Sequence, residues 1–291
     1  MGAGSPRVAF QGEPGAFSEE AIEGLFGLGV AVACPHRDFA DVAGAVLTGA
    51  AEFGVLPAEN SIHGSVTPTH DVLAGGGLSV LDEIICPIHL CLMALPGVQQ
   101  EQLRTVLSHP VALNQCRRFF AQSPGLEAVP FYDTAGAARD VAARADVTAA
   151  AVASRAAAAR YGLDILAASI EDRPDNQTRF FLVARSGEAQ RIGELDGGSC
   201  KAVLMVDAAH QPGSLLGVLA PFAARGINLT RIESRPGPVA WTYHFFVEAV
   251  AAGGRAELED ALQEVERAAN RVTVFGIFQP QRRHWTATLS A

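Results

Sequence analysis

One stretch near residue 190 divides the chain into two parts that can fold separately. Residues 185–199 lose all hydrophobic periodicity and carry four glycines, a pattern that is typical of a linker. A chain of 291 residues is long enough for about two domains. We therefore expect a first domain over residues 6–186, a linker over 187–199, a second domain over 200–279 and a tail over 280–291.

The composition indicates a folded protein whose main partner is neither nucleic acid nor a membrane. Hydrophobic residues make up 49% of the chain and charged residues 18%, which is too apolar for a disordered protein. The 22 basic and 31 acidic residues give a net charge of −9, which repels nucleic acid and anionic lipid. An anionic small substrate would need a local, preorganised positive site.

The cysteines and the first residues bear on the compartment. Five scattered cysteines without a C-x-x-C pair argue against a disulfide framework and a zinc ribbon, and fit a reducing environment. The chain begins without an apolar leader, and no run approaches the ~18 apolar residues of a membrane span. We expect a cytoplasmic protein.

Strand–turn–helix patterns predict an α/β fold for the first domain. Residues 8–11 form a candidate strand, a glycine-containing turn follows, and Ser18 can cap the next helix. Further strands are expected over residues 30–33, 53–57, 78–88, 90–95, 105–108, 151–153 and 178–183, and further helices over 39–48 and beginning near Pro110, Thr134 and Arg155, with Asp133 and Ser154 as caps. We expect two lobes, the first over about 6–80 and 171–186 and the second over about 84–170, with the last strand returning to the first lobe.

The second domain has a compact βαββαβ pattern. Strands are expected over residues 202–206, 227–234, 241–250 and 272–278, and helices over 213–222 and 256–269. This order is typical of a ferredoxin-like half-sandwich, in which helices cover one face of the sheet. We expect the other face to be left for a partner, and hence a homodimer or homotetramer.

Several familiar catalytic motifs are absent from the sequence. It contains no phosphate-binding P-loop, no dinucleotide-binding G-x-G-x-x-G after a strand and no G-x-S-x-G elbow. Its eight histidines show no spacing typical of zinc ligands. We expect no metal and no cofactor.

Polar residues cluster where strands are expected to end. Glu59, Asn60 and Ser61 follow the strand over 53–57, and Ser108-His109-Pro110 ends another strand, with Gln115 shortly after. In open α/β sheets, ligands bind beyond the carboxyl ends of strands. Each cluster alone is also typical of an ordinary turn, so the prediction of a site depends on their occurring together.

These clusters resemble the prephenate dehydratase family. The resemblance is carried by Gly12-Glu13-Pro14-Gly15-Ala16-Phe17-Ser18, by residues 57–66, by Ser108-His109-Pro110 with Gln115-Cys116, and by Asn176-Gln177-Thr178-Arg179-Phe180. Residues 212–215 and 227–236 resemble the ACT regulatory module of that family. The resemblance implies a two-lobed domain like the type 2 periplasmic binding proteins, with the substrate between the lobes, in a monofunctional enzyme without a fused chorismate mutase.

The implied reaction is the loss of water and carbon dioxide from prephenate, which gives phenylpyruvate in L-phenylalanine biosynthesis. Aromatisation of the ring drives it, so no cofactor is required. The resemblance makes Thr178 the catalytic residue, aimed at the departing ring hydroxyl. Arg179 is a candidate clamp for a carboxylate, because guanidinium binds carboxylates bidentately. However, neighbouring strand residues point to opposite faces, so either the strand bends there or Arg179 is structural.

The remaining residues implied around the substrate form a mostly neutral hydrogen-bonding cradle. Glu59 stands out among them, because a carboxylate beside a dianion must be protonated or paired with a cation, and a structural role suits it equally. The full set of expected substrate-binding residues is Ala16, Phe17, Glu59, Asn60, Ser61, Ser108, Gln115, Arg179 and Phe180.

The ACT resemblance implies control by L-phenylalanine, bound where two modules meet. Backbone N–H groups at the start of a helix can hold the carboxylate of a free amino acid. The residues expected to bind the effector or transmit its binding are His210, Gly213, Ser214, Leu215, Glu233, Ser234 and Arg235. His210 stands where these modules usually carry Asn or Asp, and Ser214 where they usually carry alanine, which leaves the effector's identity open.

Two alternative functions remain open from the sequence. An arogenate dehydratase would act on a substrate with an amino group in place of the keto oxygen, and no single residue here decides between the two. A non-catalytic sensor would close two lobes on an anion without turnover. A hydroxyl at position 178 favours an enzyme, because a pure binding protein has no need of one at the leaving group.

Overall fold

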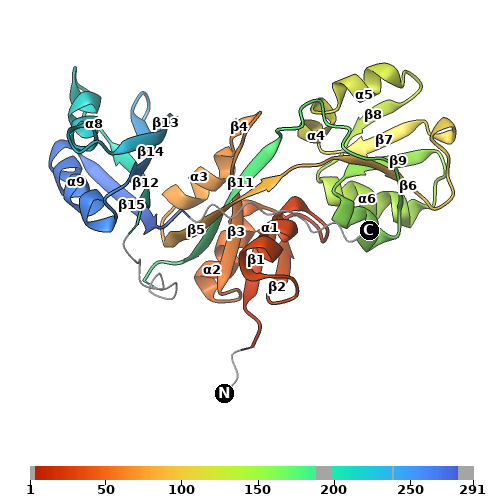
Figure 1. The fold of residues 1–291 in the computed structure, drawn as a ribbon, viewed down its shortest axis with the longest axis horizontal. Coiled ribbons are helices and arrows are strands. Elements are labelled where there is room, and N and C mark those ends of the chain that lie inside the picture. The colour runs from red at the N-terminus through yellow and green to blue at the C-terminus, as the bar shows by residue number, and fades with distance from the viewer. Residues whose placement is uncertain (1–3, 188–197, 238, 281–291) are drawn as a thin grey trace. The chain divides into compact units, whose positions relative to one another are not determined.

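Three parallel strands and the helices between them form the N-terminal part of the protein. In this computed structural model, β1 (Arg7–Gln11) pairs in parallel with β2 (Val32–His36) and with β3 (Phe53–Asn60). Helices α1 (Phe17–Phe26) and α2 (Phe39–Thr48) connect these strands (Figure 1). The structure describes residues 4–187, 198–237 and 239–280.

The first sheet has the strand order β2-β1-β3-β11-β5, with a short strand β4 paired to β3. The elements not yet given are β4 (Gly64–Ser65), α3 (Thr67–Ala74), β5 (Leu78–Pro87) and β11 (Gln177–Arg185). Strand β11 lies beside β3 although more than 100 residues separate them in the chain. The last strand of the first domain therefore returns to the first sheet, as the sequence predicted.

The second sheet has the order β10-β6-β9-β7-β8. Its strands are β6 (Cys91–Ala94), β7 (Thr105–Ser108), β8 (Glu127–Pro130), β9 (Ala149–Ala153) and β10 (Asp164–Ala167). The helices between them are η1 (Gln100–Gln102), α4 (Pro110–Asn114), α5 (Arg117–Gln122), α6 (Thr134–Arg144) and α7 (Arg155–Tyr161). Phe17 of α1 packs against the apolar core of this sheet.

The third sheet has the order β13-β14-β12-β15 and forms the C-terminal part of the chain. Its elements are β12 (Cys200–Asp207), α8 (Ser214–Ala224), β13 (Asn228–Pro236), β14 (Tyr243–Ala251), α9 (Arg255–Ala268) and β15 (Arg271–Phe278). Apolar side chains of both helices pack on one face of the sheet, with Val206, Phe222 and Leu262 among them. The βαββαβ order is the predicted one.

The described residues divide into two compact units. Residues 4–70 and 84–180 form the first unit, and residues 71–83, 181–187, 198–237 and 239–280 form the second. The expected linker and tail fall mostly on residues 188–197 and 281–291, which lie outside the described residues. None of the helices in the described ranges has both the length and the apolar character needed to cross a membrane.

Local capping signals explain where several helices begin. The carboxylate of Asp133 accepts a hydrogen bond from Gly136 N at 2.7 Å, and the hydroxyl of Ser154 accepts one from Ala157 N at 3.0 Å. Both predicted caps are confirmed. The predicted cap at Ser18 is wrong, because α1 already begins at Phe17, and the peptide oxygen of Ala16 accepts the first helical hydrogen bonds. Ser18 lies inside the helix and is buried.

The second strand lies two residues further along the chain than the sequence predicted. The pattern favoured residues 30–33, but β2 spans Val32–His36, with Val32 opposite Arg7 and His36 opposite Gln11. Residues 28–30 are instead part of the turn that follows α1. Pairing with β1 therefore sets the strand, and an exposed apolar residue such as Val30 gave the wrong signal.

The expectation of a free sheet face in the C-terminal part is wrong. The face of the third sheet opposite its helices buries Val203, Met205 and Phe275. Part of β5 covers it within the second unit: a side-chain carbon at Gly276 would lie 1.9 Å from the Val80 carbonyl oxygen. Only glycine can stand at position 276, because the backbone of β5 passes directly over β15.

Charged side chains are buried on the same covered face. The ammonium of Lys201 in β12 lies 2.7 Å from a carboxylate oxygen of Glu83 in β5 and 2.7 Å from one of Glu248 in β14. All three residues are less than a tenth exposed. Arg231 of β13 extends this group through Glu248 at 3.4 Å. We refer to Glu83, Lys201, Arg231 and Glu248 as the buried charge cluster.

Candidate active site

A pocket of about 480 Å³ lies within the first unit, where strand ends meet the first turns of helices. Its wall takes Asn60 and Thr178 from β3 and β11 of the first sheet. It takes His109 and Gln115 from the two ends of α4, beside the second sheet. The pocket thus lies between the two lobes of this unit, and its volume is that of a small-molecule site.

Strand β11 presents alternate side chains to this pocket. Thr178 and Phe180 line it, whereas Arg179 between them does not. The guanidinium of Arg179 lies 2.8 Å from a carboxylate oxygen of Glu59 on the neighbouring strand, and its side chain is only 11% exposed. Successive strand residues point to opposite faces, so the strand stays regular here and pairs Arg179 with Glu59.

The hydroxyl of Thr178 is held by one neighbour. The side-chain amide of Asn60 donates to Thr178 Oγ1 at 3.0 Å, and also contacts Asn176 Oδ1 at 2.9 Å and the Gln177 carbonyl at 3.0 Å. The carbonyl oxygen of the Asn60 side chain accepts from the backbone N–H groups of Ile62 and His63, both at 3.0 Å. These two bonds fix the orientation of the Asn60 amide.

The structure brings six of the ten residues expected at the substrate together around this pocket. They are Ala16, Phe17, Asn60, Gln115, Thr178 and Phe180. The side-chain amide of Gln115 lies 3.5 Å from Asn176 Oδ1, and Gln115 is itself buried. Four separate segments of the sequence therefore converge on one cavity.

Four of the expected residues do not line the pocket, and each has another partner. Glu59 and Arg179 pair with each other. The hydroxyl of Ser61 donates to the Asp175 carbonyl at 3.1 Å and accepts from Gln177 N at 3.0 Å. The hydroxyl of Ser108 is wholly buried and donates to the Val152 carbonyl at 2.5 Å. Ser108 is the last residue of β7 and faces its neighbouring strand β9.

His109 is a pocket residue that the sequence analysis did not select. His109 directly follows Ser108, the last residue of β7, and its side chain faces the cavity. Burial lowers the pKa of the His109 imidazole, which favours the neutral ring at neutral pH. Its Nδ1 accepts from Val111 N at 3.3 Å, so the ring proton lies on Nε2. The alternation rule applied to Ser108 could have found it.

The pocket contains no obvious cation for an anionic ligand. None of the residues that line it in the described part of the first unit is lysine or arginine. Positive potential comes instead from helix N-termini, because α1, α3 and α6 all begin at the wall. The first turn of α1 has no side-chain cap, so its N–H groups can face a ligand.

Asp133 also lines the pocket, and it is the N-cap of α6. Burial raises the pKa of its carboxyl group, whereas the hydrogen bond from Gly136 N acts in the opposite direction. Within the part of the chain that the structure describes, no group of three or more His, Cys, Asp or Glu side chains is arranged to hold a metal ion.

Helix α1 carries a carboxyl group that makes stability depend on pH. Burial raises the pKa of Glu20 to about 7, and its neighbours include Ser154, Glu23 and His89. The folded protein thus retains this proton between about pH 4.5 and 7 while the unfolded chain releases it. Stability from this group therefore falls as the pH rises through that range.

Replacing Glu20 with glutamine is expected to remove this loss. The free energy of unfolding of Glu20→Gln relative to the natural sequence should rise by about 1–3 kcal/mol between pH 4.5 and pH 8. Urea unfolding at both pH values measures it. Glu266→Gln, at an exposed position of α9, should show the same difference at both pH values. An unchanged difference for Glu20→Gln would contradict the prediction.

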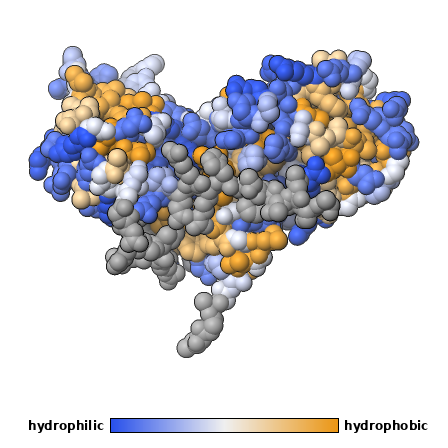
Figure 2. All heavy atoms as spheres, in the orientation of Figure 1, coloured by the Kyte–Doolittle hydropathy of each residue, from blue (hydrophilic) through white to orange (hydrophobic). Residues whose placement is uncertain are grey.

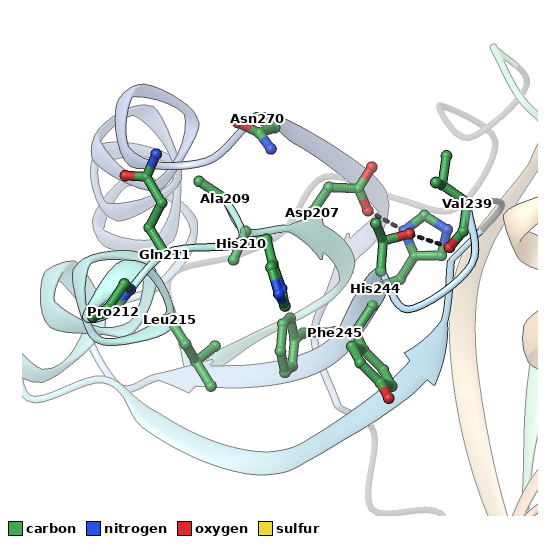
Figure 3. A pocket seen from close by; sticks show the side chains of 13 residues that line it. Asp207, Ala209, His210, Gln211, Pro212, Leu215, Val239, His244, Phe245 and Asn270 are labelled. Carbon is green, nitrogen blue, oxygen red and sulfur yellow. Dashed lines mark hydrogen bonds and ion pairs between the residues drawn. The ribbon is translucent and has the colours of Figure 1, made fainter.

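A second pocket, of about 580 Å³, lies in the C-terminal sheet region of the second unit. His210 and Leu215 line it, together with Phe245 and Asn270 (Figure 3). Asp207 lines it as well and contacts His244 Nδ1. Of the seven residues expected to respond to an effector, His210 and Leu215 line this pocket, whereas Gly213 caps α8 in the left-handed conformation and Ser214 begins that helix.

The other three expected effector residues lie on β13. Glu233 pairs with Arg231 at 2.5 Å and approaches Arg235 at 3.9 Å. Arg235 also lies 3.5 Å from a carboxylate oxygen of Asp71, which belongs to α3. Ser234 is exposed and pairs in the sheet with Phe245. Glu233 and Arg235 therefore connect with the buried charge cluster.

The fold and the pocket define a two-lobed α/β protein with a small-molecule site between its lobes and a separate ferredoxin-like domain. The family model described as prephenate dehydratase matches residues 8–188, and the model of the ACT domain matches residues 202–267. The chain belongs to the prephenate dehydratase family, whose members are carbon–oxygen lyases, and it carries an ACT domain.

Two curated relatives match almost the whole chain. A prephenate dehydratase of Mycolicibacterium vanbaalenii is 37% identical over 288 residues, which cover 93% of this chain and 90% of the relative. Arogenate dehydratase/prephenate dehydratase 2 of Arabidopsis thaliana, a chloroplastic protein, is 38% identical over 282 residues, covering 94% of this chain and 72% of the relative.

Two solved structures share the fold over 94% of this chain. The prephenate dehydratase of Arthrobacter aurescens in complex with L-Phe is 32% identical, with a TM-score of 0.85 and 91% of that chain covered. GqqA, described as a novel type of quorum quenching acylase, is also 32% identical, with a TM-score of 0.83 and 98% covered. The predicted fold class, a two-lobed type 2 binding-protein architecture with an ACT domain, is confirmed.

Proposed function

We propose that the protein converts prephenate to phenylpyruvate, water and carbon dioxide. The observation that carries this proposal is a threonine hydroxyl in the pocket that accepts from Asn60 and has its own proton free for a ligand. In the reaction the ring C–O bond breaks and the hydroxyl leaves as water. The bond to the ring carboxylate breaks as well, and its electron pair completes the aromatic ring.

The residues around Thr178 suit this chemistry. Thr178 donates a hydrogen bond to the departing hydroxyl, and the resulting charge stabilisation lowers the barrier. A threonine is a weak acid, so Thr178 supplies a hydrogen bond, and the proton that turns the departing hydroxyl into water is drawn from solvent. The Nε2–H of neutral His109, on the wall beside the second sheet, is a second donor. Family membership supports the assignment of Thr178 as the catalytic residue.

The dianion is held by neutral groups and helix N-termini. The backbone at Ala16 and Phe17, where α1 begins without a side-chain cap, receives one carboxylate. Gln115 offers a further amide, and Phe180 supports the ring. Arg179 and Glu59 act by holding β11 against β3, since they pair outside the pocket. Ser61 and Ser108 hold the turns in place through their backbone partners.

Arogenate is the second candidate substrate. A carboxylate on the wall, Asp133, could receive the ammonium group that distinguishes arogenate from prephenate. Its raised pKa and its bond to Gly136 N reduce the charge available for that role, so we place prephenate first. The Arabidopsis relative, whose name covers both activities, supports testing both.

We propose L-phenylalanine as the effector of the ACT domain. The complex of the Arthrobacter protein with L-Phe supports this assignment. In this chain Leu215 and Phe245 line the pocket beside α8 and suit a phenyl ring. The start of α8 at Gly213 and Ser214 follows the lining residue Pro212, has no side-chain cap hydrogen bond and suits a carboxylate. Bound there, the amino acid would affect Glu233, Ser234 and Arg235 through β13 and β14.

The oligomeric state and the compartment are also proposals. Apolar side chains stand exposed around α8, β13 and β14, among them Leu216, Ile232 and Trp241, and Figure 2 shows apolar surface in this region. Pairing of two ACT domains would cover them, which supports a homodimer or homotetramer. All five cysteines are free thiols, which supports a reducing compartment, the cytoplasm.

A kinetic comparison of the two substrates tests the proposed function. We expect purified protein to form phenylpyruvate from prephenate with a larger kcat/KM than it shows for arogenate. Added L-phenylalanine should change turnover and raise the melting temperature. Absence of turnover on both substrates would leave the non-catalytic sensor. Turnover without any response to L-phenylalanine would refute the effector assignment alone.

A further inference from the structure

The crossing segment before β11 contains a buried side chain that contacts both walls of the pocket. Asn176 is wholly buried and does not itself line the cavity. Its side-chain oxygen accepts from Asn60 at 2.9 Å and from Gln115 at 3.5 Å. Asn60 belongs to β3 of the first sheet, and Gln115 follows α4 beside the second. One oxygen thus receives an amide from each lobe.

The orientation of the whole group follows from its donors and acceptors. Backbone N–H groups fix the Asn60 side chain with its NH₂ toward Asn176 and Thr178. The oxygen of Asn176 must then face Asn60 and Gln115, because both neighbours present amide donors. Thr178 accepts from Asn60, so its own proton points elsewhere, and no protein acceptor for it exists in the described part of the chain.

The NH₂ group of Asn176 is an unfavourable feature of this arrangement, because it is a buried donor that makes no hydrogen bond within the described residues. A buried donor without an acceptor is unfavourable, so an apolar residue of similar shape would be cheaper if only packing mattered. The backbone of Asn176 is fixed as well, because its carbonyl accepts from Ile88 N at 2.8 Å. Within the described residues, the oxygen is thus the only atom of this side chain that makes a hydrogen bond.

We propose that Asn176 is a positioning residue for the reaction at Thr178, an inference that rests on the proposed function. Its side-chain oxygen accepts a hydrogen bond from Asn60, which in turn directs the Thr178 hydroxyl into the pocket. The same oxygen also accepts a hydrogen bond from Gln115 of the opposite lobe. The alignment of the hydroxyl then depends on the two lobes meeting at this residue.

Replacing Asn176 with leucine, which keeps its approximate shape, tests the proposal. We expect kcat on prephenate to fall about 10–100-fold, as for a misaligned catalytic group, with KM changed less than about threefold. Asn176→Asp keeps an accepting oxygen and should retain most of kcat, while its charge raises KM for an anionic substrate. As a control, Thr69→Val removes another buried hydrogen bond, from Thr69 to the Pro57 carbonyl, and should leave kcat within about twofold.

A double-mutant cycle separates positioning from a general structural effect. If Asn176 acts through Thr178, Asn176→Leu should change kcat less than about threefold in a Thr178→Ala background. An unchanged kcat for Asn176→Leu in the natural background overturns the proposal. So does a double variant whose loss of kcat equals the product of the losses in the Asn176→Leu and Thr178→Ala single variants. If the leucine variant does not fold, Asn176→Asp is used instead. The proposal is then overturned if Asn176→Asp loses as much kcat as Thr178→Ala does. Inactivity of the natural sequence refutes the proposed function itself.

Discussion

Thr178→Ala is expected to lower kcat on prephenate by about 10²–10⁴-fold with little change in KM. A hydrogen bond to the leaving oxygen strengthens as charge develops on it, so its loss raises the barrier more than it weakens substrate binding. Thr178 is 9% exposed and its hydroxyl accepts a hydrogen bond from Asn60, so the alanine variant loses one methyl group and one hydroxyl from an otherwise unchanged wall. Initial rates of phenylpyruvate formation measure the effect.

Thr178→Ser is the matched control for this prediction. It keeps the hydroxyl that Asn60 directs and removes only the methyl group, so kcat should stay within about tenfold of that of the natural protein. The melting temperatures of both variants should be similar, which separates chemistry from folding. An alanine variant with more than about a third of the natural kcat would show that Thr178 is not the donor.

The position of Thr178 could be predicted because strand alternation is a local property. The sequence alone indicated that Thr178 and Arg179 cannot both face one side of a regular strand, and the structure keeps the strand regular. The same rule explains why the side chain of His109, and not that of Ser108, faces the pocket. The sequence correctly predicted that the strand ends at Ser108, but it did not show that the Ser108 hydroxyl faces Val152 of the neighbouring strand.

Contacts between distant segments could not be predicted in this way. Asn176 belongs to a motif that the sequence analysis recognised, yet its use depends on Asn60 and Gln115, which lie 116 and 61 residues away in the chain. Short elements such as α5 and β8 gave no clear period and were missed. The face of the third sheet opposite its helices was expected to be free, because no residue near Gly276 in the sequence indicates that β5 covers this face.

The buried charge cluster gives the second large prediction, which concerns stability. Lys201→Met is expected to lower the free energy of unfolding by about 3–5 kcal/mol, because it leaves the carboxylates of Glu83 and Glu248 buried without this cation. Methionine fills a similar volume, so the loss reports charge and not a cavity. Equilibrium urea unfolding of the full chain, followed by circular dichroism, measures it.

Two variants distinguish the loss of buried charge balance from a general effect of the substitution. Arg255→Met breaks an ion pair with Glu259 in which both side chains are about half exposed, and it should cost less than about 1 kcal/mol. Adding Glu83→Gln to Lys201→Met removes one of the two carboxylates that Lys201 balances in the natural sequence, so the double variant should be more stable than Lys201→Met alone. A loss no larger than that of Arg255→Met, or a double variant less stable than the single one, would show that Lys201 does not balance these charges. The expected result would show that charge as well as packing holds this part of β5 on the sheet that it covers within the second unit.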